Sequence, residues 1–254
     1  MTHRENNVVE LPDALVANHF LASLDGNSRS KLAPHLRLTT LRTGELLCDA
    51  GENLNAVYFP VTAGVSLQFM GSGRGTLGVT EIGREGVVCD DIVGSAMQRR
   101  VVVYGGGFAY RLGTHRFADA CAASAAIRRQ VFVRMSLVLS QASQVMFCSR
   151  HHTIRHQLMR WLLIGYERSR SIEIPVTHGM LGQMLGVRRE TVTETTRQIH
   201  ALDLIHQRRG VIVLTDLARL ERASCGCHRA IRDETRRLLA LDAGALPALG
   251  ARMV

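Results

Sequence analysis

The chain has 254 residues, a formal net charge of +9, and 46% hydrophobic, 5% aromatic and 21% charged residues. This length is sufficient for two ordinary domains. The composition is that of a globular protein and excludes a disordered chain or a small disulfide framework. The six cysteines are too widely spaced for a stapled scaffold, and we expect most of them to be reduced core residues.

Positive charge in this chain comes almost entirely from arginine, since Lys31 is the only lysine. The guanidinium group is a planar fork of donors that suits phosphate groups and guanine edges, and a strongly basic domain favours polyanionic partners. Taken alone, the arginine-rich composition is explained equally well by a genome that encodes arginine in place of lysine.

Targeting and membrane signals are weak. No uninterrupted apolar run approaches the ~20 residues that span a bilayer. The first residues, MTHRENNVVELPD, are polar where a secretory signal is apolar. We therefore expect a cytoplasmic protein without a membrane partner.

In the N-terminal half, the sequence pattern changes from one typical of helices to one typical of strands. Residues 11–36 have apolar positions three and four apart around a Gly-Asn-Ser break, which predicts short helices. Residues 38–117 contain short β-prone runs separated by glycine, which predict a small barrel or sandwich. The glycines at 105–107 predict a tight turn that tolerates positive φ. The predicted strands are 56–61, 65–70, 77–82, 101–104 and 108–112.

Residues 127–148 have an amphipathic apolar pattern without proline or glycine, which predicts one long helix. Such a helix either packs only on its own β domain or forms a dimer seam, and we favour the seam because a long helix between two domains is a natural two-fold interface. A second helix is predicted at 151–166. The resulting domains are residues 1–120, 121–149 and 150–254, the last with a helical extension at its end.

The segment THGMLGQMLGVRRETVTETTRQIHALDLI has the spacing of a helix-turn-helix. We expect Gly182 to let two helices approach closely, Gly186 to form a left-handed turn between them, and Val192 to pack the second helix onto the first. Thr177 is the expected N-cap of the first helix, and Met180, Leu181, Met184 and Leu185 are its expected buried face.

A second helix at 188–201, with Val192, Ile199 and Leu202 pointing inward, leaves a polar face for a DNA groove. An Arg-Arg-Gly tip between two β-prone runs predicts a wing that contacts phosphates. Each signal alone has an ordinary structural explanation, but their order predicts a winged helix-turn-helix that binds duplex DNA. The expected DNA-binding residues are Thr177, His178, Arg188, Arg189, Glu190, Thr191, Thr193, Glu194, Arg197, Arg208 and Arg209.

On the residues LGQMLGVRRETVTETTRQIHALDLI followed by RRGVIVLTDLARL, the chain resembles the Crp/Fnr family of bacterial transcription regulators. The resemblance implies an α+β fold: an N-terminal β-roll like the cyclic-nucleotide-binding jelly roll, a long dimerisation helix and a C-terminal winged helix-turn-helix. It also implies a homodimeric, sequence-specific regulator that reads a pseudopalindromic operator and contacts RNA polymerase. The family's Arg-Glu pair matches at Arg189 and Glu190, but Glu194 stands where an arginine is usual, so the operator half-site is expected to differ.

In cyclic-nucleotide-binding members, a phosphate cassette combines a Gly-Glu-Leu run with a later arginine and two small residues. The corresponding stretch here, IGREGVVCDDIVGSAMQRRVVVY, contains acidic Asp90 and Asp91, and two valines replace the small pair. We therefore expect that cyclic AMP is not bound, and we leave the effector open. The candidate effector-binding residues are Glu85, Arg99 and Arg100.

The run SCGCHRA places Cys225, Cys227 and His228 close together. They could hold a soft metal or form a redox pair, and a thiol- or metal-dependent redox sensor is the alternative function. A full site needs about four ligands, no second cluster of this kind follows, and two cysteines two apart in one helix point to different faces. We therefore expect a structural role and no cofactor.

Three further classes of site have little support. The family's iron–sulfur sensor has a cysteine cluster near its N-terminus, but no cysteine precedes Cys48. The histidines at 151, 152 and 156 suit haem or metal, but are more often polar surface. We expect no catalysis, because no GxSxG, Walker or HExxH pattern is present.

Overall fold

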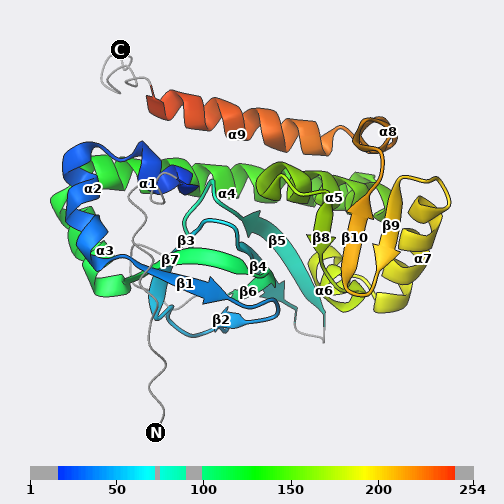
Figure 1. Ribbon diagram of the computed structural model, residues 1–254, viewed down its shortest axis with the longest axis horizontal. Coiled ribbons are helices and arrows are strands. Elements are labelled where there is room, and N and C mark those ends of the chain that lie inside the picture. The colour runs from blue at the N-terminus through cyan, green and yellow to red at the C-terminus, as the bar shows by residue number, and fades with distance from the viewer. Residues whose placement is uncertain (1–16, 72–74, 90–98, 244–254) are drawn as a thin grey trace, which may run out of the picture.

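The computed structural model describes residues 17–71, 75–89 and 99–243 (Figure 1). The expected helical start at 11–16 and the acidic Asp90 and Asp91 lie outside these ranges. The elements before the long helix are α1 (His19–Ser23), α2 (Gly26–Leu32), the 3-10 helix η2 (Ala33–His35), β1 (Arg37–Leu41), β2 (Leu46–Cys48), β3 (Ala56–Pro60), β4 (Gly64–Met70), β5 (Thr76–Ile82), β6 (Arg100–Gly105), β7 (Gly107–Gly113) and α3 (Thr114–Ala123).

The elements that follow form the long helix and the C-terminal domain. They are α4 (Ala125–His151), α5 (Ile154–Ser169), β8 (Glu173–Pro175), α6 (His178–Leu185), α7 (Arg189–His200), β9 (Ile205–Arg208), β10 (Val211–Leu214), α8 (Leu217–Ala223) and α9 (Cys227–Ala243). The predicted order of β-rich domain, long helix and winged helix-turn-helix, and the α+β class, are confirmed.

The β-rich domain has two antiparallel sheets, with strand orders β1-β7-β3 and β2-β6-β4-β5. Side chains alternate across a strand, so one side of each sheet supplies the apolar core. Val65, Val101 and Val103 are fully buried there. The five predicted strands are confirmed to within one residue at each end, and β1 and β2 are additional.

The three glycines at 105–107 form the predicted tight connection between β6 and β7, and none of them adopts a positive φ. Gly107 is required for close approach instead. A Cβ atom on Gly107 would lie 2.6 Å from Thr62 Oγ1 and 2.7 Å from Ala63 N. The turn therefore needs glycine because a side chain has no room.

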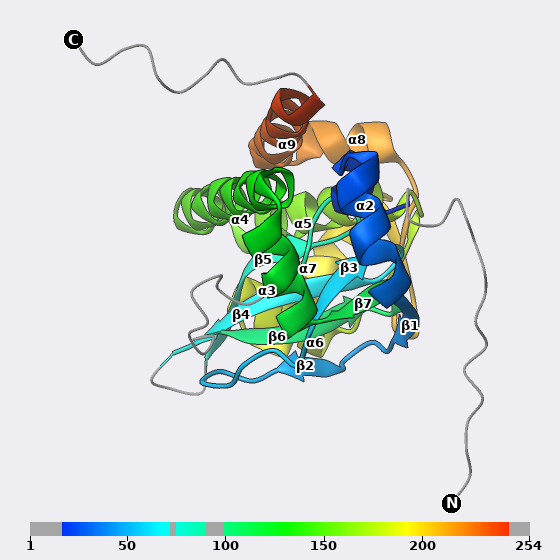
Figure 2. The ribbon, with the colours of Figure 1, turned by 90° about the vertical axis from the view of Figure 1, so that its left-hand side faces the viewer.

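Helix α4 lies between the β-roll and α9, which runs alongside it (Figures 1 and 2). It begins at the N-cap Ser124, whose hydroxyl accepts a hydrogen bond from the Ile127 amide. Its buried face includes Val131, Val145 and Cys148, and it continues to His151, three residues beyond the predicted end. Helix α5 begins only at Ile154, because His152 is extended and Thr153 caps α5.

The C-terminal domain has its own apolar core, formed by α5 to α8 and the sheet β8-β10-β9. Trp161 and Leu162 of α5, Leu181 of α6, and Val192 and Ile199 of α7 are buried in it. Tyr104 of the β-roll packs edge-on against Trp161, with ring centroids 5.5 Å apart. This shared contact joins the two domains.

Candidate nucleic-acid interface

Helix α6 begins and ends at the two residues that the sequence indicates. The Thr177 hydroxyl accepts a hydrogen bond from the Met180 amide at 3.2 Å, which caps the helix. The helix ends at Gly186, which adopts φ +67°. Both predictions are confirmed, and the positive φ explains why glycine suits this turn.

Gly182 lets the turn fold back onto α6. A Cβ atom there would lie 2.8 Å from the Val187 carbonyl oxygen, closer than ordinary contact allows. The Val187 amide donates to the Gly182 carbonyl oxygen at 2.9 Å. The predicted close approach is confirmed, and it is made against the turn that leads into α7.

Helix α7 presents its apolar residues inward, with Val192 and Ile199 fully buried as predicted. The predicted inward position of Leu202 is wrong, since this side chain is 43% exposed. The helix ends at His200 with Ala201 as C-cap, and the chain then turns, so that Leu204 fills the core instead. Thr195 and Thr196 are also buried, because their hydroxyls donate to helix carbonyls one turn earlier.

The outer face of α7 is polar. His178 Nδ1 lies 2.9 Å from Thr193 Oγ1, which ties α6 to α7 beside this face. Arg197 pairs with Glu194 on the surface at 2.5 Å. Such exposed pairs contribute only about 0.3 to 0.5 kcal/mol, so either side chain can leave this pair at small cost. The residues that line a shallow groove on this face are Arg189, Glu190, Thr193, Glu194 and Arg197.

The other expected contact residues flank this face. Arg188 is the N-cap residue of α7 and is exposed, as is Thr191. Strands β9 and β10 form the expected hairpin, with Arg208 and Arg209 exposed at its tip and Gly210 at φ +73°. Arg208 Nη1 lies 3.4 Å from Glu173 Oε1 of the adjoining strand β8. The tip of the hairpin therefore presents Arg208 and Arg209 to solvent.

The three candidate effector residues do not meet at one site. Glu85 pairs with Arg168 of α5 at 2.8 Å, and Arg100 pairs with Asp49 at 2.9 Å. Arg99 lines a different space, a largely apolar cavity of about 560 Å³ between strands β4 and β5 and helix α4. An effector role for Glu85 and Arg100 would require each to leave its present partner.

Arg168 is the centre of a buried network that joins the C-terminal domain to the β-roll and to α4. Its Nη2 donates to the Glu81 carbonyl oxygen at 2.6 Å and to Gln141 Oε1 at 3.0 Å. Burial raises the pKa of Glu85, but Arg168 and backbone N–H donors outweigh it and hold this pKa below its usual value. The same network raises the pKa of Arg168, so the pair is ionised in the folded protein.

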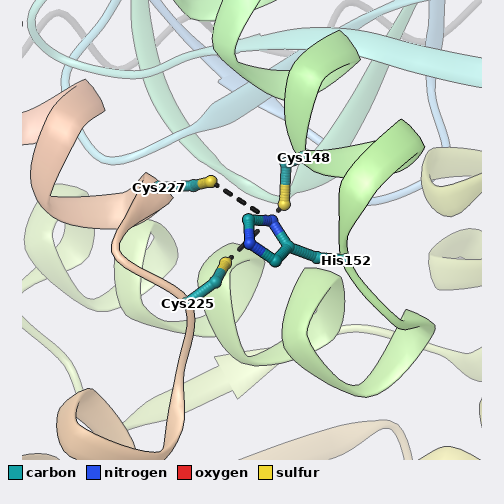
Figure 3. Close-up of side chains that lie close together, drawn as sticks. All are labelled: Cys148, His152, Cys225 and Cys227. Atoms are coloured by element: carbon teal, nitrogen blue, oxygen red, sulfur yellow. Dashed lines mark hydrogen bonds between the residues drawn. The ribbon is translucent and has the colours of Figure 1, made fainter.

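The cysteine cluster is larger than the sequence indicates. Cys148 and His152, at the end of α4, lie beside Cys225 and Cys227 (Figure 3). One possible ligand atom from each of the four lies within 4.8 Å of all the others. The expectation that no further ligands are available is thus corrected, because the two pairs come together only in the folded chain.

The geometric argument against the Cys-x-Cys pair also fails. Helix α9 begins at Cys227, so Cys225 lies before the helix and both sulfurs point to the same centre. His228 lies apart from this group: its Nδ1 is 3.0 Å from the Cys225 carbonyl oxygen and its Nε2 is 3.1 Å from Glu221 Oε1. Sequence reasoning named His152 but set it aside as polar surface, and it missed Cys148; their spacing of four residues is the signal that could have joined them.

The thiols influence one another. A hydrogen bond with Cys148 lowers the pKa of the Cys225 thiol to about 4 and raises the pKa of the Cys148 thiol. Burial raises the pKa of the Cys227 thiol. Of the three thiols, that of Cys225 therefore ionises most readily.

Comparisons with known proteins identify the domain that carries this interface. The family profile of the Crp-like helix-turn-helix domain matches residues 156–223. No curated protein sequence matches the chain.

Solved structures match about three quarters or more of the chain. A Crp/Fnr-family transcriptional regulator from Eubacterium rectale has a TM-score of 0.62 at 13% identity, covering 82% of this chain and 96% of its own. FixK2 from Bradyrhizobium japonicum has a TM-score of 0.64 at 17% identity, covering 75% and 98%. The c-di-GMP-responsive global regulator CLP from Xanthomonas campestris has a TM-score of 0.62 at 14% identity, covering 76% and 100%. Residues 156–223 are thus a Crp-like helix-turn-helix domain, set within the fold of the Crp/Fnr transcription regulators.

Proposed function

We propose that this protein is a sequence-specific, DNA-binding transcription regulator of the Crp/Fnr type that acts as a homodimer. The observation that carries the proposal is the exposed polar face of α7, held on a Crp-like helix-turn-helix. Arginine at this position bonds guanine O6 and N7, glutamate accepts from cytosine N4, and the wing arginines suit phosphates. The DNA-binding residues proposed are those expected from the sequence.

The homodimer rests on the exposed apolar stripe of α4, which borders the cavity beside Arg99. Apolar residues there are spaced three and four apart, as on a coiled-coil seam, and the four largest are between 41% and 69% exposed. A second copy of α4 would bury them. The seam residues are Phe132, Met135, Leu139, Ala142 and Met146.

By length and composition α4 is also the one helix of the described residues that could cross a membrane, with a mean hydropathy of 1.3 over 18 residues. Its opposite face, however, carries buried Gln130, Arg134 and Gln141 and packs on the β-roll. We assign its exposed apolar residues to the dimer seam and propose a cytoplasmic, non-catalytic protein.

Dimerisation would set two α7 helices about 34 Å apart, so that both enter successive major grooves of a pseudopalindromic operator. RNA polymerase is the further partner that we propose for the bound regulator. The cavity beside Arg99 is the place where a small molecule would reach α4, although its chemical identity stays open. The prediction that cyclic AMP is not bound stays a prediction.

Replacing Arg189 with alanine is expected to weaken binding by about 1 to 3 kcal/mol, or about 5-fold to 150-fold in Kd, and to relax the base preference at one position per half-site. The probe is a duplex selected by the wild-type chain from a random-sequence pool, with affinity measured by fluorescence anisotropy at fixed salt. Arg116→Ala, an exposed arginine on α3, is the matched control and should bind like wild type. Unchanged affinity and unchanged base preference in Arg189→Ala would refute its role in base reading.

A further inference from the structure

We propose that Cys148, His152, Cys225 and Cys227 bind one Zn²⁺ ion in a closed, structural site. Zinc in such sites is held by four protein ligands, and a set of three cysteines and one histidine is among the usual ones. All four residues converge on one centre from two segments of the chain (Figure 3). The proposal rests on these residues alone and stands whether or not the protein binds DNA.

The spacing of the ligand atoms fits a tetrahedron around one ion. Zinc–sulfur bonds of about 2.3 Å and zinc–nitrogen bonds of about 2.0 to 2.1 Å give tetrahedral edges of about 3.8 Å between sulfurs and about 3.5 Å between sulfur and nitrogen. Here the Cys148 and Cys225 sulfurs are 3.7 Å apart, and Cys227 Sγ is 3.5 Å from His152 Nδ1. The remaining pairs lie within 4.8 Å and need to close by about 1.3 Å at most.

The same spacing argues against an iron–sulfur cluster. Such a cluster distributes its cysteine ligands over two or four iron atoms, so ligands on different irons lie farther apart than ligands on one ion. Four ligand atoms within 4.8 Å of one another surround a single ion. Soft thiolates with an imidazole in tetrahedral arrangement favour zinc among the common divalent metals.

Burial and charge also favour an ion at this centre. The three cysteines form a buried cluster of their own, with exposures of 0%, 8% and 3%. Zn²⁺ with three thiolates and a neutral histidine carries one net negative charge. Arg160, which is 2% exposed, acts electrostatically on the Cys148 thiol, and its Nε and Nη1 have no hydrogen-bond partner among the described residues. A negatively charged metal centre would compensate this buried cation.

The position of the site indicates what the ion would hold together. Cys148 and His152 stand where α4 ends and passes into α5, and Cys225 and Cys227 stand where α8 passes into α9. The ion would therefore fasten the start of α9 to the joint between the long helix and the helix-turn-helix domain. Because the unfolded chain has no preformed site, binding there adds directly to the stability of the fold.

The test is the zinc content of the full-length chain, purified without chelators and measured by elemental analysis against protein concentration. We expect one zinc per chain in wild type and loss of zinc in Cys148→Ser, His152→Ala and Cys227→Ser. Two matched controls should keep their zinc: Cys121→Ser, a buried cysteine on α3, and His151→Ala, the exposed histidine next to His152.

Cobalt provides a second measurement that does not depend on variants that fold poorly. Wild-type protein reconstituted with Co²⁺ should show a thiolate-to-cobalt charge-transfer band and the visible bands of tetrahedral cobalt. A chelator should lower the Tm of wild type but leave that of Cys227→Ser unchanged. The proposal is overturned by wild type without zinc and without cobalt bands, by iron with inorganic sulfide, by a Cys148–Cys225 disulfide in the isolated protein, or by equal zinc loss in Cys121→Ser.

Discussion

Replacing Arg168 with leucine is expected to lower the free energy of unfolding by about 3 to 5 kcal/mol. The guanidinium pairs with Glu85 at 2.8 Å and lies 3.6 Å from Glu81 Oε2, and all three side chains are largely buried. Leucine would fill similar space but leave two carboxylates in the interior without their cation. Removal of one partner of a buried ion pair costs more than the pair contributes, because the remaining charge stays desolvated.

Urea unfolding at pH 7 measures this loss. Arg155→Leu, an exposed arginine on the same helix, is the matched control and should change the free energy of unfolding little. Adding Glu85→Gln to the Arg168 variant should restore part of the loss, because one of the unpaired charges disappears. A loss of unfolding free energy below about 1 kcal/mol, or no restoration by Glu85→Gln, would contradict the claim that this network holds the C-terminal domain to the β-roll.

Replacing Leu139 with arginine is expected to weaken binding to a selected duplex by about 100-fold to 10,000-fold. Leu139 lies at the middle of the exposed stripe on α4 and is 69% exposed in the single chain, so the change should not disturb the monomer's own core. Two arginines facing each other across the seam would repel and separate the protomers. Each monomer would then bind one half-site and lose the gain that comes from linking two binding events.

Sedimentation analysis of the free protein and fluorescence anisotropy with the same duplex measure the two parts of this effect. Phe108→Arg makes the same change of an exposed apolar residue to arginine on strand β7, away from α4, and should remain dimeric. A Leu139→Arg protein that stays dimeric with wild-type affinity would show that α4 is not the seam. A monomeric protein with wild-type affinity would show that dimerisation is not required for binding.

Those parts of the fold that local patterns specify could be predicted from the sequence. The five predicted strands are short apolar runs separated by glycines, and α4 has no helix-breaking residue inside it. Strands β1, β2 and β8 were not predicted. They are three to five residues long and mostly exposed or half-buried, so pairing with their neighbours, rather than their own sequence, makes them strands.

Prediction of the helix-turn-helix succeeded because its constraints are close in sequence. Gly182, Gly186 and Thr177 each act within a few residues of their partners. The prediction that Leu202 points inward failed for a related reason. It assumed that α7 continues to this residue, but the helix ends at His200. The end of a helix is set by the chain that follows, which periodicity does not describe.

The Cys/His cluster shows the limit of sequence reasoning most clearly. Cys148 and Cys225 are 77 residues apart, and their sulfurs meet because the connection between α8 and α9 lies against the end of α4. The assumption that the Cys-x-Cys pair lies within a helix was wrong, because the helix begins at Cys227. Contacts of this kind depend on the tertiary packing of two helices, which no local pattern in the sequence specifies.

The most direct test of the proposed function is the symmetry of the DNA that the wild-type chain selects from a random duplex pool. Two α7 helices related by a dimer axis should enrich an inverted repeat whose half-sites are centred about 10 base pairs, or about 34 Å, apart. DNase I footprinting of that duplex should protect both half-sites together. Selection of an unrepeated half-site, of a direct repeat, or of no common sequence would contradict a homodimer that reads DNA through α7.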